Sequence, residues 1–230
     1  SSSPLNTCDV ENPDIKLAKM MRRLSKEELI NSYVNLFGSQ FENRYKVDIS
    51  LIPNPSYVRE SNHDGHIFNG PFFESVLNLG QKVSNDIVNN KESMTLLFSD
   101  SCISEEILTD TCLKKFISDL GMKVYRRPLT QDEQSSYLEM SNLNNYQNNY
   151  TEESLSLKNL NREERLKSII FGMLISPDFL TVYFPNNISS QFYSFHIASY
   201  LSFLFTKEPP DNILLSKAKN KSLETIEQLK

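Results

Sequence analysis

The sequence predicts an all-α protein, an irregular bundle of about seven helices with a long loop or a minor hairpin over residues 44–71. Apolar residues recur at helical spacing in seven segments, and capping residues stand at the start of four of them. The 230 residues include only six glycines, too few for the many tight turns of an all-β chain. The seven segments are residues 25–38, 72–88, 111–125, 130–140, 161–177, 194–205 and 209–219.

The first two helices are predicted from a capping pattern and from an apolar face. Ser25 and Glu28 stand three residues apart and form a predicted capping box, and Gly38 suits the left-handed position after the helix. The second segment, "FFESVLNLGQKVSNDIV", repeats apolar residues along one helical face. Those residues are Phe73, Val76, Leu77, Gly80, Val83 and Ile87.

The next two helices are expected to meet at "RRPLT", which begins at Arg126. Pro128 disfavours helical geometry at Arg127 and ends one helix, and Thr130 with Glu133 forms a second capping box. Arginines at a helix end meet the negative end of its dipole and can donate to free carbonyls. We predict that Arg126, Arg127, Pro128 and Thr130 form a structural joint, with at least one arginine buried against backbone carbonyls or a carboxylate of another helix. The alternative is a ligand site.

Three further helices complete the bundle. Asn161 caps the fifth, which stops before Pro177, and Asp211 caps the last. The segment "SFHIASYLSFLF" is apolar nearly all round, so we expect it to be a central, buried helix. Residues 44–71 lack helical spacing and contain prolines, glycines and a short β-prone piece, so they are expected to form the loop or hairpin.

These elements suggest a division of the chain into a tail and three helical modules. The tail is expected at 1–21 and the first helical module at 22–100. The second module is expected at 101–184. Residues 185–230 are expected to begin a third module that packs on the second.

Composition and charge exclude two classes of partner. The formal net charge is −5, whereas binding to a nucleic-acid backbone needs a clustered basic face, so we expect no nucleic acid. The longest apolar run, residues 169–175, is far shorter than the roughly 20 residues that span a bilayer, so we expect no transmembrane segment. No secretory signal is visible at the first residues.

The three cysteines do not decide whether the protein works in an oxidising or a reducing compartment. Cys102 and Cys112 lie ten residues apart, and a loop of that size can close as a disulfide. The alternative is three incidental thiols. Cys8 is far from both in the sequence and is free, paired elsewhere or lipidated.

Few residues are candidates for chemistry, and we expect no catalytic residue and no cofactor in this chain. His63, Asp64 and His66 are a weak candidate for a metal site, and the alternative is a solvated turn. His196 lies on an apolar helix and is expected to be a core histidine, because no nucleophile motif accompanies it.

Three segments carry motifs that occur in this order in one bacterial family. The first, R-R-L-[ST]-[RK]-x-E-[YL]-x-N-[TS]-V-R-D-L-[LF]-G, is matched by Arg22, Arg23, Leu24, Ser25, Lys26, Glu28, Asn31, Ser32, Leu36, Phe37 and Gly38. The second, C-x-x-x-F-x-x-x-x-G-x-x-x-[YF]-R-R-P-L-T-x-x-E with a later S-P-x-F-L, is matched by Cys112, Phe116, Gly121, Tyr125, Arg126, Arg127, Pro128, Leu129, Thr130, Glu133, Ser176, Pro177, Phe179 and Leu180. The third, A-S-x-L-S-x-x-L with P-D-D-x-L-L, is matched by Ala198, Ser199, Leu201, Ser202, Pro210, Asp211, Leu214 and Leu215.

With these motifs the chain resembles the multidomain exported proteins of unknown function of planctomycetes, myxobacteria and predatory bacteria, which are often linked to planctomycete-type cytochrome c domains. The resemblance implies an extracytoplasmic location, in the periplasm or at the cell surface, and it favours a disulfide between Cys102 and Cys112. It also implies a non-catalytic helical module that interacts with a protein or a cell-surface partner. The alternative is the N-terminal part of a c-haem redox or hydrolytic enzyme whose active region lies outside this chain.

The sequence departs from the family motifs at charged positions. Val34 and Asn35 stand where the family has Arg and Asp, and His196 and Tyr200 stand where it has Glu and Arg. We therefore expect any polar site that those motifs build to be lost or altered here.

Overall fold

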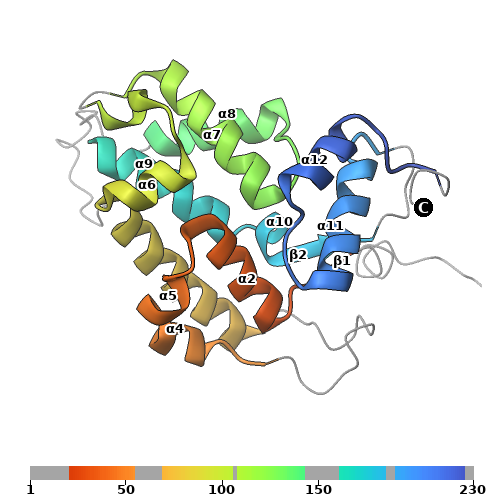
Figure 1. The fold of residues 1–230 in the computed structure, drawn as a ribbon. Helices are drawn as coiled ribbons and strands as arrows, with labels where there is room; N and C mark the ends of the chain where they lie inside the picture. Colours follow the sequence, from red (N-terminus) through yellow and green to blue (C-terminus); the bar gives the residue numbers. More distant parts are fainter. Residues whose placement is uncertain (1–20, 55–68, 106–107, 143–160, 185–189, 226–230) are drawn as a thin grey trace, which may run out of the picture.

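The computed structural model describes residues 21–54, 69–105, 108–142, 161–184 and 190–225. These residues form eleven α-helices, one short 3-10 helix and a two-stranded sheet (Figure 1). The helices are α2 (Lys26–Phe37), α3 (Phe41–Arg44), α4 (Lys46–Leu51), α5 (Gly70–Val88), α6 (Lys91–Leu97), α7 (Asp110–Tyr125), α8 (Gln131–Asn142), α9 (Arg162–Leu174), α10 (Pro177–Leu180), α11 (Tyr193–Thr206) and α12 (Asn212–Lys219). The 3-10 helix is η2 (Ser101–Ser104), and the strands are β1 (Met21–Arg23) and β2 (Thr181–Tyr183).

The predicted all-α class is confirmed, and the seven predicted segments correspond to the longer helices. Within the described ranges seven helices have eight residues or more: α2, α5, α7, α8, α9, α11 and α12. The other four, α3, α4, α6 and α10, have four to seven residues and carry too few apolar positions for a periodic signal.

The predicted N-terminal caps are present at the helix starts. The Ser25 side chain accepts a hydrogen bond from the backbone N–H of Glu28, and the Glu28 carboxylate accepts one from the N–H of Ser25. Thr130 and Glu133 exchange the same pair of bonds at α8. Asn161 begins α9 with a further capping box, and Asp211 accepts from the N–H of Leu214 at α12. These local signals therefore fixed where four helices begin.

The expectation for residues 44–71 is wrong at both ends, because Arg44 ends α3, residues 46–51 form helix α4, and residues 70–71 begin α5. The β-prone alternation of this piece is not used. Tyr45, Ile49 and Ile52 instead lie at i, i+4 and i+7, and this spacing places them on one helical face against the core. Residues 55–68 lie outside the described residues.

The main core lies between α5, α7, α8 and α9, and α2 packs across it. A second, smaller apolar cluster belongs to the α11–α12 pair. Its fully buried members are Phe195, Ile197, Ala198, Ala218 and Leu223.

Helix α11 was expected to be central, and this expectation is wrong. Figure 1 shows α11 and α12 at one edge of the molecule, next to β2 and α10. One face of α11 is buried through Ala198 and Phe203, whereas the Phe205 side chain is 77% exposed. An apolar composition all round predicts burial only when other elements surround the helix, and α11 has neighbours on one side.

The two strands form a short antiparallel ribbon that the sequence did not predict. Arg23 pairs with Thr181, and Met21 pairs with Tyr183. The backbone N–H of Leu24 continues the ladder by donating to the carbonyl of Leu180 at 2.8 Å. The ribbon therefore joins the start of α2 to the end of α10, although about 160 residues of chain separate them.

Candidate functional site

The polar centre of the fold is a group of side chains at the end of α7, here called the arginine corner: Arg126, Arg127, Glu133, Asp178 and Thr181. Arg126 ends α7 with φ of 57°, in the left-handed region, and this geometry turns the chain sharply. Its side chain is buried beneath α10 and α11.

Arg126 binds backbone carbonyls. Its guanidinium donates to the carbonyl of Thr181 at 2.6 Å, to that of Phe179 at 3.3 Å, and to that of Asp178. These carbonyls lie in and just after the single turn of α10, where a helix has no partners for them. Burial lowers the pKa of Arg126 to about 10, so the side chain still carries its charge at neutral pH. Arg126 thus acts as a C-terminal cap for a helix more than 50 residues away.

Arg127 binds carboxylates. Two of its nitrogens bond to the two oxygens of Glu133 at 2.9 and 2.8 Å, and one also bonds to Asp178 Oδ1 at 2.7 Å. Burial alone raises the pKa of Glu133, but Arg127 and the N–H of Thr130 outweigh it, so the pKa lies below its ordinary value. Paired arginine–carboxylate geometry of this kind is strong and directional.

Aromatic rings from α11 and from Phe192, the residue before this helix, cover the corner. The Phe203 ring lies 5.3 Å from the guanidinium carbon of Arg126, and the Phe192 ring lies 4.5 Å from that of Arg127. Both distances suit cation–π attraction. His196, between these two rings in the sequence, stacks on Tyr183 with the ring centres 5.1 Å apart.

The structure therefore brings together all four residues of the predicted joint and adds residues that the sequence reasoning missed. Asp178 and the carbonyls of α10 are the missing partners of the two arginines. A weak signal was present, because Ser176, Pro177 and Asp178 are typical of a helix start. No local pattern indicated that this helix would lie against the arginines. The assignment of the pair as a structural joint stays a prediction.

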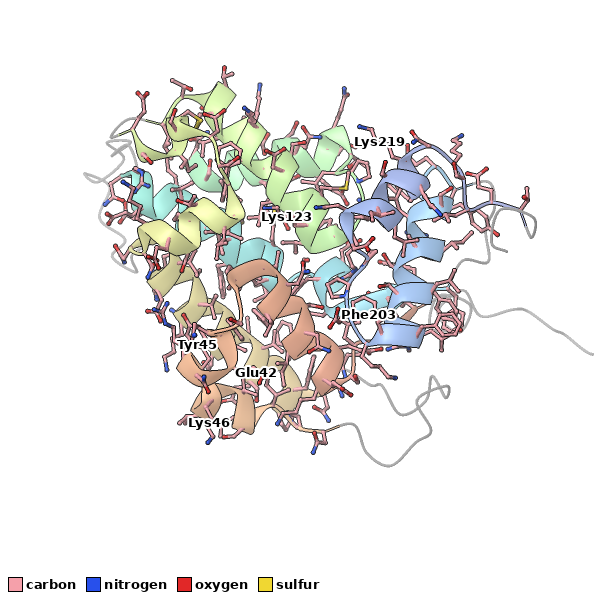
Figure 2. All side chains as sticks on the ribbon, viewed as in Figure 1. Glu42, Tyr45, Lys46, Lys123, Phe203 and Lys219 are labelled. Carbon is pink, nitrogen blue, oxygen red and sulfur yellow. A yellow bond between two sulfur atoms is a disulfide. The ribbon has the colours of Figure 1, made fainter. Side chains whose placement is uncertain are left out.

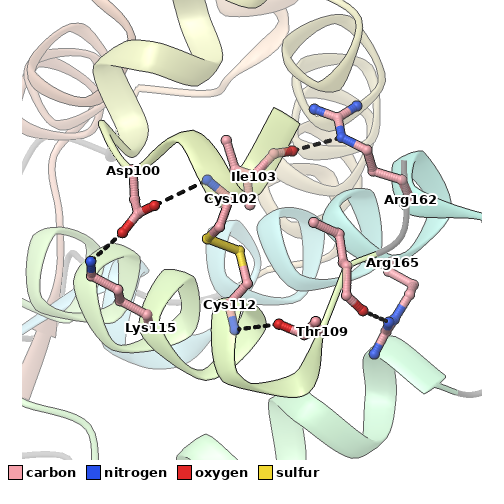
Figure 3. Close-up of a disulfide and its surroundings, with 9 residues drawn as sticks. Asp100, Cys102, Ile103, Thr109, Cys112, Lys115, Arg162 and Arg165 are labelled. Carbon is pink, nitrogen blue, oxygen red and sulfur yellow. Dashed lines mark hydrogen bonds and ion pairs between the residues drawn. A yellow bond between two sulfur atoms is a disulfide. The ribbon is translucent and has the colours of Figure 1, made fainter. Parts of the chain in front are cut away.

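The disulfide between Cys102 and Cys112 is present, with 6.0 Å between the Cα atoms. It links η2 to the first turn of α7 (Figure 3). The Arg162 side chain donates to the carbonyl of Ile103 at 2.7 Å, and Arg165 donates to that of Leu108 at 2.8 Å. The covalent bond and two arginines of α9 thus hold the chain around the disulfide against the core.

The remaining candidate residues do not form a site in the described part of the chain. His63, Asp64 and His66 lie outside the described residues. Among the described residues, no three His, Cys, Asp or Glu side chains gather as metal ligands would. His196 is half-buried on α11, where burial first and the charge of Arg127 next lower its pKa to about 4.

The described surface has an open hollow next to the corner and several outward-facing apolar side chains, among them Leu204 and Phe205 on α11. The hollow has a volume of about 590 Å³ and lies between the start of α8 and the start of α11. Its lining residues are Pro128, Leu129, Thr130, Gln131, Asp132, Gln191, Phe192 and Phe195. Elsewhere, Val47 and Leu51 point outward from α4.

Among the described helices, none combines the length and the apolar character needed to cross a bilayer. Comparisons of the chain with protein-family models, with curated proteins and with solved structures find no match. The function is therefore argued from the residues of the chain itself.

Proposed function

We propose that this chain is a non-catalytic interaction module of an exported bacterial cell-envelope or surface protein, and that a protein partner docks on α4. The disulfide supports an extracytoplasmic location, because such bonds persist in oxidising compartments. The motif resemblance to exported bacterial proteins supports the same location.

The observation that carries the interaction role is the apolar pair on α4. Val47 and Leu51 lie one helical turn apart, and their side chains are 73% and 65% exposed. Large apolar side chains that share an exposed face are typical of binding surfaces. Charged residues flank Val47 in the sequence, namely Lys46, which Figure 2 labels on α4, and Asp48. An apolar centre with a polar rim is the usual anatomy of a protein–protein interface.

Helix α4 is also held firmly enough to present this pair. The Tyr45 hydroxyl and the Asp86 carboxylate form a hydrogen bond of 2.9 Å, and Lys82 pairs with Asp48 at 2.7 Å. The Lys26 side chain donates to the carbonyl of Ile52 at 2.9 Å. These bonds tie a six-residue helix to α2 and α5, which lowers the ordering cost of binding.

The arginine corner supports a structural rather than a catalytic role for the most polar region. Arg126 donates to three backbone carbonyls, and Arg127 is paired with two carboxylates. A catalytic group must instead reach a substrate or hold a proton near the working pH. The contacts of these side chains join α7, α8 and α10.

The test compares binding of three versions of the chain to proteins of the native cell envelope. The wild type, Val47→Glu/Leu51→Glu and Ile213→Glu are immobilised, and captured proteins are quantified by mass spectrometry. Ile213 is the matched control, because it is 71% exposed on α12, away from α4. We expect a partner that the wild type and the control retain, and that the α4 variant loses by about tenfold or more, since a charge in an apolar interface costs several kcal/mol.

Three outcomes contradict the proposal. The first is that no protein is captured above background. The second is that all three versions retain the same proteins equally. The third is that the Ile213 variant alone loses binding, which moves the interface to α12.

A further inference from the structure

The α11–α12 pair is docked on the rest of the molecule rather than merged with it. The two helices share their own small apolar cluster, and few of their side chains enter the main core. Phe203 is the member of α11 that is fully buried in the main core, where it covers Arg126. A further bond, from Asn31 of α2 to the carbonyl of Lys207 at 2.9 Å, fixes the end of α11.

His196 lies on the face of α11 that contacts β2. Its ring is nearly parallel to that of Tyr183 in β2, with 19° between the planes. One turn earlier, the centre of the Phe192 ring lies 6.4 Å from that of the His196 ring. The Phe192 ring also covers the guanidinium of Arg127, which follows the end of α7. The imidazole is thus part of the contact that holds α11 against the ribbon and the arginine corner.

The charges around His196 disfavour a proton on its ring. The facing groups are the Tyr183 hydroxyl from β2, Arg126 and Arg127 from the end of α7, and Asp178 from α10. Asp178 is the one carboxylate among them, and Arg127 already bonds to it at 2.7 Å. A protonated imidazole would therefore be half-buried next to two buried cations, with its nearest counter-charge already engaged.

We propose that His196 is an acid-sensitive latch: while its ring is neutral, α11 stays docked on the arginine corner, and protonation releases α11 and α12 together. Release would expose Phe192, Phe203 and the ribbon, and so create a second apolar surface under acid conditions. This inference does not depend on the docking face on α4.

The direction of the effect follows from proton linkage. The pKa of His196 is lowered to about 4 in the docked state, against an ordinary value of about 6.5 in the released state. The released state therefore binds the proton more tightly. Docking is fully favourable above about pH 6.5, and it weakens about tenfold for each pH unit between that value and about pH 4.

Amide hydrogen exchange of the whole chain at pH 7 and pH 5 tests the latch. Protection of α11, corrected for the intrinsic pH dependence of exchange, reports the docking equilibrium. In the wild type we expect it to fall about twentyfold, as linkage between these two pKa values predicts. In His196→Phe, which keeps an aromatic ring on Tyr183 without a proton site, protection should change little. The amides of α5 serve as the internal reference in both chains.

Equal losses of protection in the two chains would overturn the proposal, because another group would then be responsible. If His196→Phe already lacks protection at pH 7, the decision passes to an NMR titration of His196 in the wild type. A midpoint below about pH 5 is expected, and a midpoint at or above about pH 6 would contradict the latch.

Discussion

The chain has two Arg-Arg pairs, each followed by a capped helix, and the structure uses the two pairs in opposite order. In the first, "RRLSKEE", the leading arginine Arg22 forms two bonds of 2.7 Å to the capping-box residue Glu28. In the second, "RRPLTQDE", the trailing arginine Arg127 forms the paired bonds to Glu133. The arginine and the glutamate that it binds are six residues apart in both segments.

The difference arises from one extra residue between the second pair and its cap. Ser25 follows the first pair after one residue, whereas Pro128 and Leu129 separate the second pair from Thr130. Because the six-residue reach is the same, the extra residue changes which arginine faces the glutamate. The other arginine of each pair does not bind the glutamate and can contact other groups. A pair of arginines therefore has no fixed role, and its distance from the following cap decides it.

The two remaining arginines meet the same part of the molecule. Arg23 lies in β1, pairs through its backbone with Thr181, and places its guanidinium 3.9 Å from the Phe72 ring centre. Arg126 reaches the carbonyl of Thr181 from the other side. Residues 178–181 are thus held by both arginine pairs, and this segment links the strand before α2 to the end of α7. From its three bonds to carbonyls of this segment, we infer that Arg126 fixes it in place.

Removing Arg126 should give the largest loss of stability. Arg126→Ala leaves the buried carbonyls of Asp178, Phe179 and Thr181 without donors, so we expect a loss of about 3–4 kcal/mol in the free energy of unfolding. Equilibrium unfolding in urea measures it. Arg126→Lys keeps the charge but not the fork and should recover only part of the loss. A loss below about 1 kcal/mol would contradict the assignment of the arginine pair as a structural joint.

Removing the disulfide should destabilise the chain without touching either arginine pair. Cys102→Ser/Cys112→Ser opens a loop with a sequence separation of ten, for which loop entropy predicts roughly 2–3 kcal/mol. Urea unfolding with and without reductant measures this loss. The same reductant should leave the stability of the double variant unchanged. Three free thiols in the denatured, unreduced wild type would contradict the bond.

The two arginine–glutamate pairs should differ in strength because their carboxylates differ in burial. The side chain of Glu28 is 1% exposed, whereas that of Glu133 is 28% exposed. Arg22→Ala strands a buried carboxylate and should cost about 2–3 kcal/mol, and Arg127→Ala should cost about 1–2 kcal/mol. Chemical denaturation of both variants under one buffer gives the comparison. The reverse order would show that burial of the glutamate does not set the cost.

The smallest expected effect is the acid dependence of the Glu28 pair. Burial raises the pKa of Glu28, but the Arg22 guanidinium outweighs it, so the folded-state pKa lies below the ordinary value. The pair therefore adds stability above about pH 4.3, and this contribution is lost as the pH falls through the folded-state pKa. Unfolding measured from pH 5 to pH 3 should show a steeper fall in the wild type than in Arg22→Ala. Parallel curves would rule out this source.

The features that the sequence predicted are those that depend on near neighbours in the chain. A cap such as Ser25 with Glu28 acts within three residues, and a helical apolar face acts within one or two turns. The prediction of the disulfide required the family resemblance as well, because the spacing alone did not distinguish a disulfide from free thiols.

The features that could not be predicted depend on contacts between distant segments. Strand β2 is three residues long and acquires its identity from β1, which lies far away in the sequence. The partners of Arg126 are backbone carbonyls, which no residue type reveals. The edge position of α11 likewise follows from which elements remain beside it, not from its own composition.

The role of Arg126 in fixing residues 178–181 can be tested through the exchange rate of one amide, the N–H of Leu24, which donates to the carbonyl of Leu180. Leu24 lies about 100 residues from Arg126 in the sequence, so the segment 178–181 is their link. We predict that Arg126→Ala lowers the protection of this amide by about tenfold or more relative to the amide of Leu29, through local opening of the ribbon. Arg127→Ala should leave it within about threefold of the wild type. Equal protection in the two variants, or no loss in Arg126→Ala, would contradict the claim that Arg126 fixes the segment.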